Sequence, residues 1–303
     1  MGMVRILNTA ISLPAKEAYI IFLFIRNDIW DTVIPTFLTF IAAFFYNRES
    51  WRQFPTMLLY ASIYNLLYIL TFCIANQVNG VEEDRLNKPY RPLVRGVLTV
   101  REAEKRSYIY NALFLFTAYL LDVFWYALSW QLVTLMMCNW GFSNHWFLKN
   151  VFCISIGTIL LLGAQWRIVG DEIQLQIWNF IFFLSFWAGA GLPLQDFRDQ
   201  DGDRYMRRKT LPLVLGDLPA RRYMIAHMML LSPLLYFFTI ATQIDDASEI
   251  SSPKMILVTT AQVLWHWIIA LRIWLYRNPA ADDTSYHYFV CLFCVTIPMI
   301  CFL

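Results

Sequence analysis

Two stretches of the 303-residue chain carry acidic side chains at a spacing that could bind a metal ion. The first is residues 76–96, NQVNGVEEDRLNKPYRPLVRG, and the second is residues 196–216, DFRDQDGDRYMRRKTLPLVLG. Each contains an Asp-Arg pair and then the pattern Pro-Leu-Val-x-Gly. The similarity predicts an internal repeat, and we call the two stretches the first motif and the second motif.

The acidic and amide side chains of each motif are spaced to lie on one face of a helix. Asn76, Asn79 and Glu83 stand at positions i, i+3 and i+7, with Asp84 beside them. The second motif repeats this spacing with the carboxylates Asp196, Asp199 and Asp203. Residues at these intervals project from the same side of an α-helix. Each motif is therefore predicted to present a stripe of oxygen atoms.

Oxygen ligands from two helices suit a hard cation, above all Mg²⁺, which keeps part of its water shell and is shared with substrate phosphates. A basic run follows each stripe, namely Arg85, Lys88, Arg91 and Arg95, and then Arg204, Arg207, Arg208 and Lys209. A Mg²⁺-bridged diphosphate needs this order, because the metal contacts phosphate oxygens while Arg or Lys neutralises the remaining charge. Both motifs could instead be charged cytoplasmic loops, but their repetition favours a site.

Long apolar segments must position the two motifs. Hydrophobic residues make up 58% of the chain and aromatic residues 17%. Several apolar runs approach the ~20 residues that a membrane-spanning helix requires. The chain is therefore predicted to be an all-α polytopic protein of the lipid bilayer, a single nine-helix transmembrane domain over 1–303. The predicted spans are 28–46, 56–75, 107–123, 125–139, 150–166, 175–195, 222–241, 255–275 and 286–303.

The distribution of basic residues predicts the orientation in the membrane. If the N-terminus is cytoplasmic, the predicted outer loops contain only four of the 24 Lys and Arg residues: Arg48, Arg52, Arg167 and Lys254. Both motifs then lie on the cytoplasmic side, where their stripes can face each other across one cavity. The net charge of +2 points to no particular class of partner.

Other residues give weaker signals. None of the four histidines has a partner at zinc-ligand spacing, so zinc is not predicted. Cys291 and Cys294 could bind a metal, but inside an apolar helix they are interpreted as packing residues, and no disulfide is assigned. No nucleic-acid motif and no obligate protein partner is evident. Arg26 could anchor an anion or simply flank the first span.

The two motifs resemble the signatures of the UbiA superfamily of intramembrane prenyltransferases. NQVNGVEEDRLNKPYRP is similar to the first signature, Asn-x-x-x-Asp-x-x-x-Asp with an Asn-x-Pro-x-Arg-Pro tail. DFRDQDGDRYMRRKTLP is similar to the second, Asp-x-x-Asp-x-x-x-Asp with a Lys-Thr-Leu-Pro tail. The resemblance implies Mg²⁺ and a prenyl diphosphate as ligands. It also implies a multi-pass protein of the endoplasmic reticulum with its active site facing the cytoplasm.

The resemblance assigns roles to individual residues. It implies that four carboxylates are catalytic as ligands of Mg²⁺: Asp84, Asp196, Asp199 and Asp203. It implies that Asn76 binds both the metal and the diphosphate, and that Arg91 and Lys209 contact the phosphates. Lys149, in a cytoplasmic loop, and Arg26 are further candidates for diphosphate binding.

The first motif departs from the family pattern at one position. Gly80 stands where the family has its middle Asp, and Glu83, on the face of Asn76, is the candidate metal ligand that replaces it. The first motif and the segment RNDIWDTVIPT at the first span look most like fungal members that act as membrane-bound sesquiterpene cyclases. This implies a Mg²⁺-dependent class I cyclase that ionises farnesyl diphosphate, cyclises the cation to a sesquiterpene and releases diphosphate.

Two other functions stay open on the sequence. A prenyltransferase would pass the prenyl cation to an aromatic or other acceptor, although no distinct acceptor-deprotonating residue is evident. A transporter is also built from repeats with intramembrane acids, but its polar residues should lie near mid-membrane rather than at the cytoplasmic ends. Abundant aromatic residues favour the cyclase in part, since a carbocation over an aromatic ring in a dry pocket gains about 2 kcal/mol. Aromatic residues are also common in cores and at membrane interfaces.

Overall fold

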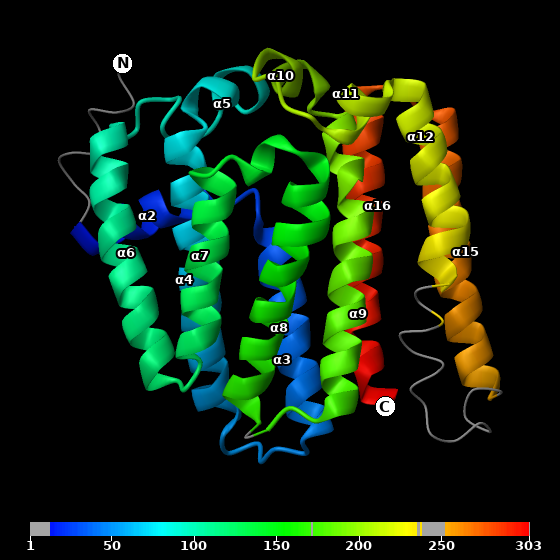
Figure 1. The fold of residues 1–303 in the computed structure, drawn as a ribbon. Coiled ribbons are helices and arrows are strands. Elements are labelled where there is room, and N and C mark those ends of the chain that lie inside the picture. The colour runs from blue at the N-terminus through cyan, green and yellow to red at the C-terminus, as the bar shows by residue number, and fades with distance from the viewer. Residues whose placement is uncertain (1–12, 171, 235–236, 238–251, 303) are drawn as a thin grey trace.

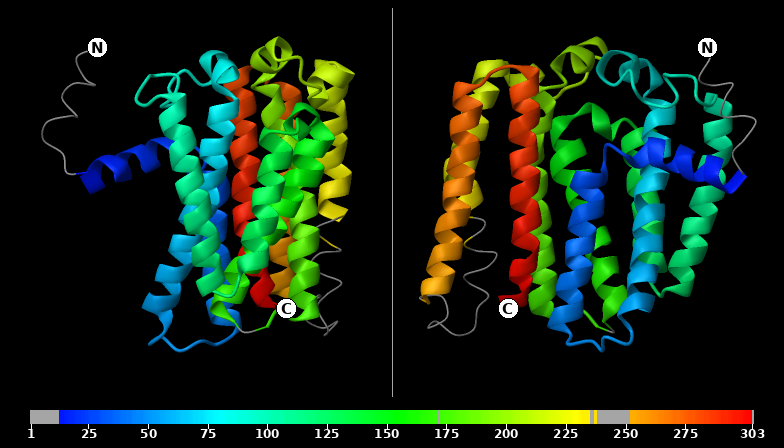
Figure 2. Two further views of the ribbon diagram at one scale, coloured as in Figure 1. Left: turned by 60° about the vertical axis from the view of Figure 1, so that its left-hand side comes forward. Right: turned by 180° about the vertical axis from the view of Figure 1, so that it is seen from behind.

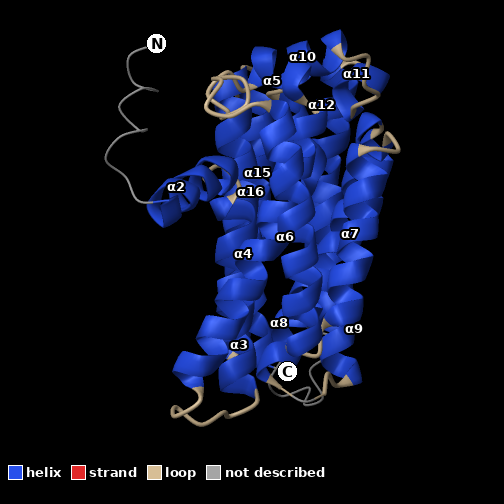
Figure 3. Cartoon of the chain, turned by 90° about the vertical axis from the view of Figure 1, so that its left-hand side faces the viewer, coloured by secondary structure: helices blue, strands red, loops and turns tan. Residues whose placement is uncertain are grey.

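The computed structural model describes residues 13–170, 172–234, 237 and 252–302, and within these ranges the chain forms helices and no strands. The long helices run side by side as one bundle, and the short helices α5, α10 and α11 cover one end of it (Figure 1). Figure 3 shows that loops join the helices mainly at the two ends of the bundle. The predicted all-α fold class is therefore confirmed for the described residues.

The N-terminal half begins with α2 (Leu13–Ile25), which lies across the bundle rather than along it (Figure 2). A π-helical turn, Ile29–Val33, then leads into the first long helix. The remaining helices of this half are α3 (Ile34–Tyr46), α4 (Phe54–Asn79), α5 (Val81–Asn87), α6 (Val100–Leu120), α7 (Phe124–Cys138), a 3₁₀ turn (Phe142–Asn144), a π-helical segment (Phe147–Ile154) and α8 (Ser155–Val169).

The C-terminal half carries the second motif between α9 and α12. Its elements are α9 (Leu175–Gly191), a 3₁₀ segment (Leu192–Phe197), α10 (Gln200–Tyr205), α11 (Leu211–Leu215), α12 (Asp217–Ala226), a π-helical segment (His227–Leu231), α15 (Pro253–Leu275), α16 (Pro279–Thr296) and a 3₁₀ segment (Ile297–Phe302). Helix α15 packs against α12, and α16 packs against the 3₁₀ segment Leu192–Phe197, so the end of the chain packs against the second motif.

Local sequence signals determine where several helices begin. The Thr99 hydroxyl accepts a hydrogen bond from the backbone N–H of Glu102 at 3.2 Å, and the Glu102 carboxylate accepts one from the Thr99 N–H at 2.8 Å. This reciprocal pair is a capping box, which satisfies two unpaired backbone donors at the start of α6. The side chains of Ser252 and Asn278 cap α15 and α16, and each is followed by a proline in the first helical turn.

Six described segments are long and apolar enough to cross a membrane: Ile29–Tyr46, Phe54–Asn79, Phe147–Val169, Leu175–Phe197, Pro253–Leu275 and Pro279–Cys301. The chain is accordingly an integral multi-pass membrane protein. Helix α7 is apolar but shorter, and α6 carries charged residues in its first two turns. Because the predicted span 222–241 falls partly outside the described residues, the count of nine spans stays a prediction, and so does the internal repeat.

One predicted span has the wrong beginning. The segment 286–303 was expected to span the membrane, but α16 begins at Pro279. The Asn278 side chain accepts a hydrogen bond from the backbone N–H of Ala281 at 3.0 Å and so caps the helix there. The first two turns of α16 are polar, so a prediction based on apolar runs did not include them.

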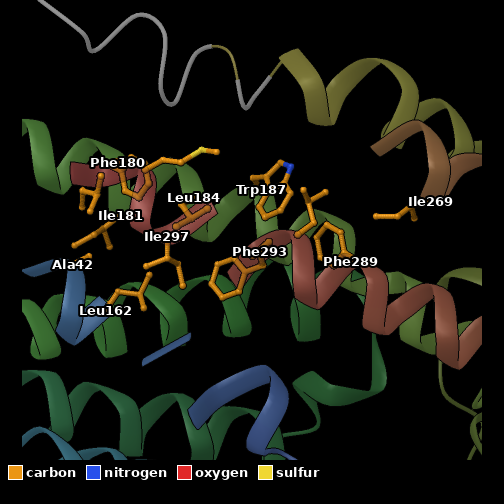
Figure 4. Close-up of a cluster of buried hydrophobic side chains, with 14 of the residues drawn as sticks. Ala42, Leu162, Phe180, Ile181, Leu184, Trp187, Ile269, Phe289, Phe293 and Ile297 are labelled. Atoms are coloured by element: carbon orange, nitrogen blue, oxygen red, sulfur yellow. The ribbon is translucent and has the colours of Figure 1, made fainter. Parts of the chain in front are cut away.

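The largest buried core lies between α3, α8, α9, α15 and α16. Trp187 of α9 packs against Phe289 and Phe293 of α16, and the ring centroids of Trp187 and Phe289 lie 5.0 Å apart (Figure 4). Within a bilayer, such close packing is a main source of attraction between helices, because lipid tails are as apolar as the side chains. The core therefore holds α9, which precedes the second motif, against α16.

A second packing contact joins α4, α7 and α8. The rings of Tyr68 and Trp130 are stacked with centroids 4.3 Å apart, and the Trp130 indole donates to the Tyr68 carbonyl at 3.0 Å. The Tyr68 hydroxyl donates to the carbonyl of Gly157 at 2.7 Å. A Cβ atom at position 157 would lie 2.4 Å from the Trp130 ring, so only glycine allows α8 to approach this closely.

We expect Gly157→Ala to lower the melting temperature of the detergent-purified protein, because the added methyl group overlaps the Trp130 ring and overpacking costs about 1–3 kcal/mol. Trp130→Phe shortens that ring, so the loss caused by Gly157→Ala should be smaller in a Trp130→Phe background. Thermal unfolding of the wild type, both single variants and the double variant measures the difference. Equal losses in the two backgrounds would contradict the contact.

Candidate active site

A cavity of about 650 Å³ begins at the end of the bundle where α5 and α10 lie and reaches between the long helices (Figure 1). Its polar part is lined by charged residues of both motifs, including Asp84, Lys88, Arg91, Arg198, Asp203 and Arg208. Its apolar part is lined by residues of α3, α4, α7, α8, α9 and α16, including Tyr68, Phe72, Trp130, Leu162, Phe289 and Phe293. The shape and lining suit an amphipathic ligand with a charged head and an apolar tail.

Both motifs contain breaks where continuous helices were expected. Helix α4 ends at Asn79, and the chain turns at Gly80 before α5 begins. The second motif passes through the 3₁₀ segment Leu192–Phe197 and a turn before α10 begins. The predicted stripes on continuous helices are therefore wrong. In the first motif the break falls at Gly80, and glycine is unfavourable inside a helix. The Asn79 side chain is exposed and bonds to its own helix, to the Ala75 carbonyl at 2.8 Å.

In the first motif, Asp84 is buried beside Arg91. One guanidinium nitrogen of Arg91, Nη1, donates to both carboxylate oxygens of Asp84 at 2.7 Å, and neither residue is more than 5% exposed. Burial raises the pKa of Asp84, and the charge of Arg91 opposes that rise. Burial also lowers the pKa of Lys88, which lines the cavity close to this pair. The first motif thus supplies the Asp84 carboxylate, whose charge is balanced by Arg91, and the amine of Lys88.

In the second motif, Asp196 and Asp203 differ in how they are paired. Asp196 is fully buried and accepts hydrogen bonds from Lys149 Nζ at 3.0 Å and Asn150 Nδ2 at 3.3 Å. Asp203 Oδ1 accepts a long bond from Arg208 at 3.4 Å, while its Oδ2 is buried and, among the described residues, accepts no hydrogen bond. Burial raises the pKa of Asp203 to about 6. Asp203 therefore has an oxygen that is available to a ligand.

Arg208 connects the two motifs. Its Nη2 atom lies 2.6 Å from Glu83 Oε2, and its Nη1 atom lies 3.4 Å from Asp203 Oδ1. This arrangement brings Glu83 of α5 and Asp203 of α10 to one part of the cavity. A Cβ atom at Gly80 would lie 2.9 Å from the Asn76 carbonyl oxygen, so the position that departs from the family pattern is in a tight turn.

The structure brings most of the predicted residues together. Those that line the cavity are Asn76, Glu83, Asp84, Arg91, Lys149, Asp199 and Asp203. Asp196 does not line it, but its ion pair with Lys149 connects it to the wall. Two basic residues lie elsewhere. Lys209 is exposed, with its backbone paired to the segment 144–146, and Arg26 donates to the carbonyl of Tyr90 at 3.0 Å.

Three basic residues of the cavity wall, Lys88, Arg198 and Arg208, were not among the predicted site residues. The signal for Lys88 and Arg208 was the basic run that follows each stripe, but spacing alone does not tell which cation faces inward. Helix α10 ends at Tyr205, and Arg207, with φ of 55°, adopts a left-handed conformation that turns the chain. As a result Arg208 lies in the cavity and Lys209 outside it.

The residues of the polar end fit a Mg²⁺ ion by their chemistry. Within the described ranges, no three His, Cys, Asp or Glu side chains converge as a ready-made metal site. Basic side chains stand between the carboxylates instead. Mg²⁺, however, commonly takes one or two protein carboxylates and completes its shell with water and substrate phosphates. The unpartnered Asp203 Oδ2 and the carboxamide of Asn76 are oxygen donors of the required kind.

These features define an integral membrane protein of the helical-bundle type with an amphipathic cavity. The sequence pattern of the UbiA prenyltransferase family matches residues 32–294 of the chain. The chain belongs to this family, and the resemblance inferred from the two motifs is confirmed.

Several named proteins are similar over much of their length. Somaliensene A/B synthase of Streptomyces somaliensis is 31% identical over 273 residues, which cover 89% of this chain and 88% of that protein. A diterpene cyclase of Hericium erinaceus is 29% identical over 290 residues, covering 93% and 88% of the two chains. A polyprenyl transferase of the same fungus is 36% identical over 155 residues, which cover 51% and 54%.

The fold is shared with solved structures. A UbiA homolog from Archaeoglobus fulgidus bound to GPP and Mg²⁺ aligns with a TM-score of 0.65 at 18% identity. The alignment covers 94% of this chain and 100% of that one. The two proteins therefore have the same helical arrangement.

We expect Arg208→Gln to weaken the binding of inorganic diphosphate in the presence of Mg²⁺ by about tenfold, since one charge-assisted hydrogen bond is worth about 1.5–3 kcal/mol. The neighbouring variant Lys209→Gln is the matched control and should change the affinity less than about threefold, because Lys209 lies outside the cavity. Isothermal titration calorimetry measures both. A larger effect of Lys209→Gln would contradict the assignment and support the sequence-based expectation for Lys209.

Proposed function

We propose that the chain is a Mg²⁺-dependent class I terpene cyclase. In this proposal, farnesyl diphosphate loses its diphosphate in the polar part of the cavity, and the prenyl cation cyclises in the apolar part to a sesquiterpene. The observation that carries the proposal is the composition of the cavity, which joins carboxylates and cations of both motifs to an aromatic wall in one space. The relatives named somaliensene A/B synthase and diterpene cyclase support it.

The polar end provides positive charge for a leaving diphosphate. Arg91, Lys149 and Arg208 line the cavity, and each forms an ion pair with a motif carboxylate. When the C–O bond breaks heterolytically, the electron pair goes to the diphosphate oxygen, and these side chains can donate hydrogen bonds to it. Mg²⁺ would add charge stabilisation of the same leaving group. The residues that would hold it are Asn76, Glu83, Asp84, Asp196, Asp199 and Asp203.

The apolar part provides a surface for a carbocation. Tyr68 and Trp130 are stacked in the wall, and Phe72 lies 5.4 Å from Trp130 between ring centroids. A cation close to an aromatic face in a desolvated site is stabilised by about 2 kcal/mol. The wall also keeps water away from the cation, which would otherwise be captured as an alcohol.

A prenyltransferase is the second candidate, because the similar region of 155 residues belongs to a polyprenyl transferase. In that reaction the cation alkylates an aromatic or other acceptor, and a second molecule must enter the cavity. The polar end and its ion pairs would act in the same way in both reactions.

We also propose that residues 1–303 form one domain in the endoplasmic reticulum membrane, with the cavity opening toward the cytoplasm. The motifs at the α5 and α10 end are rich in Arg and Lys, whereas the loops predicted at the opposite side carry four basic residues. This distribution supports the orientation, since basic residues accumulate on the cytoplasmic side.

Acceptor-free turnover separates the two candidates. We expect membranes that contain the protein to convert farnesyl diphosphate and Mg²⁺ into a hydrocarbon, because cyclisation needs no second substrate. Gas chromatography with mass spectrometry detects the product, and membranes without the protein are the control. Product that forms only after an aromatic acceptor is added would reject the cyclase in favour of the transferase.

We expect Asp203→Asn to reduce diphosphate release from farnesyl diphosphate by about a hundredfold or more, because it removes a charged metal ligand. Its melting temperature should change little, since the ion pair of Asp203 with Arg208 is long, at 3.4 Å. Asp84→Asn should lower both activity and melting temperature, because an unpaired buried Arg91 costs about 3–5 kcal/mol.

Asp201→Asn is the matched control for these two variants. Asp201 lies in α10 like Asp203, but its side chain is 98% exposed. Its activity and melting temperature should stay close to those of the wild type. Near-normal turnover of Asp203→Asn would reject the site formed by the two motifs.

A further inference from the structure

A carboxylate that belongs to neither motif faces the same cavity. Asp31 lies in the π-helical turn Ile29–Val33 before α3, and it lines the cavity together with Tyr286 of α16. The Tyr286 hydroxyl donates a hydrogen bond to Asp31 Oδ2 at 2.8 Å. The other oxygen, Oδ1, is buried and accepts no hydrogen bond from any residue that the structure describes. Asp31 Oδ2 is thus held by the Tyr286 hydroxyl, and Asp31 Oδ1 is available to a ligand.

Asp31 and Tyr286 lie at the boundary between the polar and apolar parts of the cavity. One helical turn after Asp31, Pro35 lines the cavity, and one turn after Tyr286, Phe289 and Val290 line it. All three are apolar. Pro35 lies on the same helix face as Asp31, and Phe289 and Val290 lie on the same helix face as Tyr286. A prenyl chain in the apolar part would therefore pass close to the Asp31 carboxylate.

The charge environment of Asp31 differs from that of the motif carboxylates. In the part of the chain that the structure describes, its carboxylate has the Tyr286 hydroxyl as a partner and no ion pair. The nearby Arg198 lies over the Tyr286 ring, 4.8 Å from its centroid, and pairs with Asp199 at 3.5 Å and with Asp283. A carboxylate without a bound cation keeps its basicity and can accept a proton.

We propose that Asp31 is the base that ends the cyclisation, an inference that rests on the proposed cyclase function. Asp31 Oδ1 takes the proton from a carbon next to the cationic centre, and the C–H electron pair becomes the π bond of the new alkene. The carboxylate and the cation thereby become a neutral acid and a neutral hydrocarbon. The acid returns its proton to water at the polar end when the product leaves. Tyr286 is a positioning residue that orients the carboxylate through Oδ2.

The test separates ionisation from deprotonation in Asp31→Asn. Purified protein is incubated with farnesyl diphosphate and Mg²⁺, and diphosphate release and the terpene products are measured together. We expect diphosphate release to stay within about threefold of the wild type, since the motif residues are intact. The ratio of terpene alcohols and other altered products to the wild-type hydrocarbon should rise by about tenfold or more, because a general base contributes at least that much to its step.

Asp28→Asn is the matched control, because Asp28 lies in the same segment and lines the cavity, but its Oδ2 accepts from Cys73 Sγ at 3.4 Å. It should keep the wild-type product ratio. Tyr286→Phe leaves the Asp31 charge in place and removes its hydrogen bond, so it should shift the products in the same direction as Asp31→Asn by about threefold. This variant also tests the proposal if Asp31→Asn does not fold, as judged by gel filtration in detergent.

Several outcomes would overturn the assignment. They are an unchanged product ratio in Asp31→Asn or in Tyr286→Phe, and an equal change in Asp28→Asn, which would show a general effect of charge. If the wild type itself forms no hydrocarbon without an acceptor, the proposed cyclase function fails and the base has no reaction to end. If the wild type forms hydrocarbon and Asp31→Asn forms the same mixture, the function stands and only the base is rejected.

Discussion

A buried carboxylate needs a positive partner, and this requirement organises the polar end of the cavity. Breaking such a pair by removing one member typically costs about 3–5 kcal/mol. Asp84 is paired within its own motif by Arg91, whereas Glu83 of the first motif is paired by Arg208 of the second. The Arg208 contacts hold α5 against α10. They also place cationic side chains where a diphosphate would bind. The same charges therefore stabilise the fold without the ligand and would contact the diphosphate once it is bound.

The bundle separates this charged end from an apolar interior. The core around Trp187 and Phe289 holds α9 to α16, and the stacked Tyr68 and Trp130 hold α4 to α7. The cavity lies between these contacts, and its charged residues of both motifs lie at one end of the bundle. A transporter would be expected to place them near the middle of the membrane. The observed gradient from polar to apolar instead suits an enzyme that splits an amphipathic substrate at its polar head.

The sequence predicted the helical class, the family and seven of the residues that line the cavity, because long apolar runs and repeated acidic spacing are local signals. It failed where geometry depends on backbone breaks. The turn at Gly80 and the 3₁₀ segment Leu192–Phe197 interrupt the expected stripes. The chain also turns at the left-handed Arg207, and Arg208 rather than Lys209 lines the cavity. The pairing of Asp31 with Tyr286 could not be anticipated, since 255 residues separate them and only the packing of α16 against the start of α3 brings them together.

The proposed site is tested most directly by an experimental structure with Mg²⁺ and farnesyl thiodiphosphate, an analogue whose C–S bond resists ionisation. We expect the diphosphate between α5 and α10, with Arg91, Lys149 and Arg208 in contact with its oxygens. We expect the farnesyl chain along the wall formed by Tyr68 and Trp130. A diphosphate bound outside the two motifs, or a farnesyl chain outside the cavity, would contradict the proposed site.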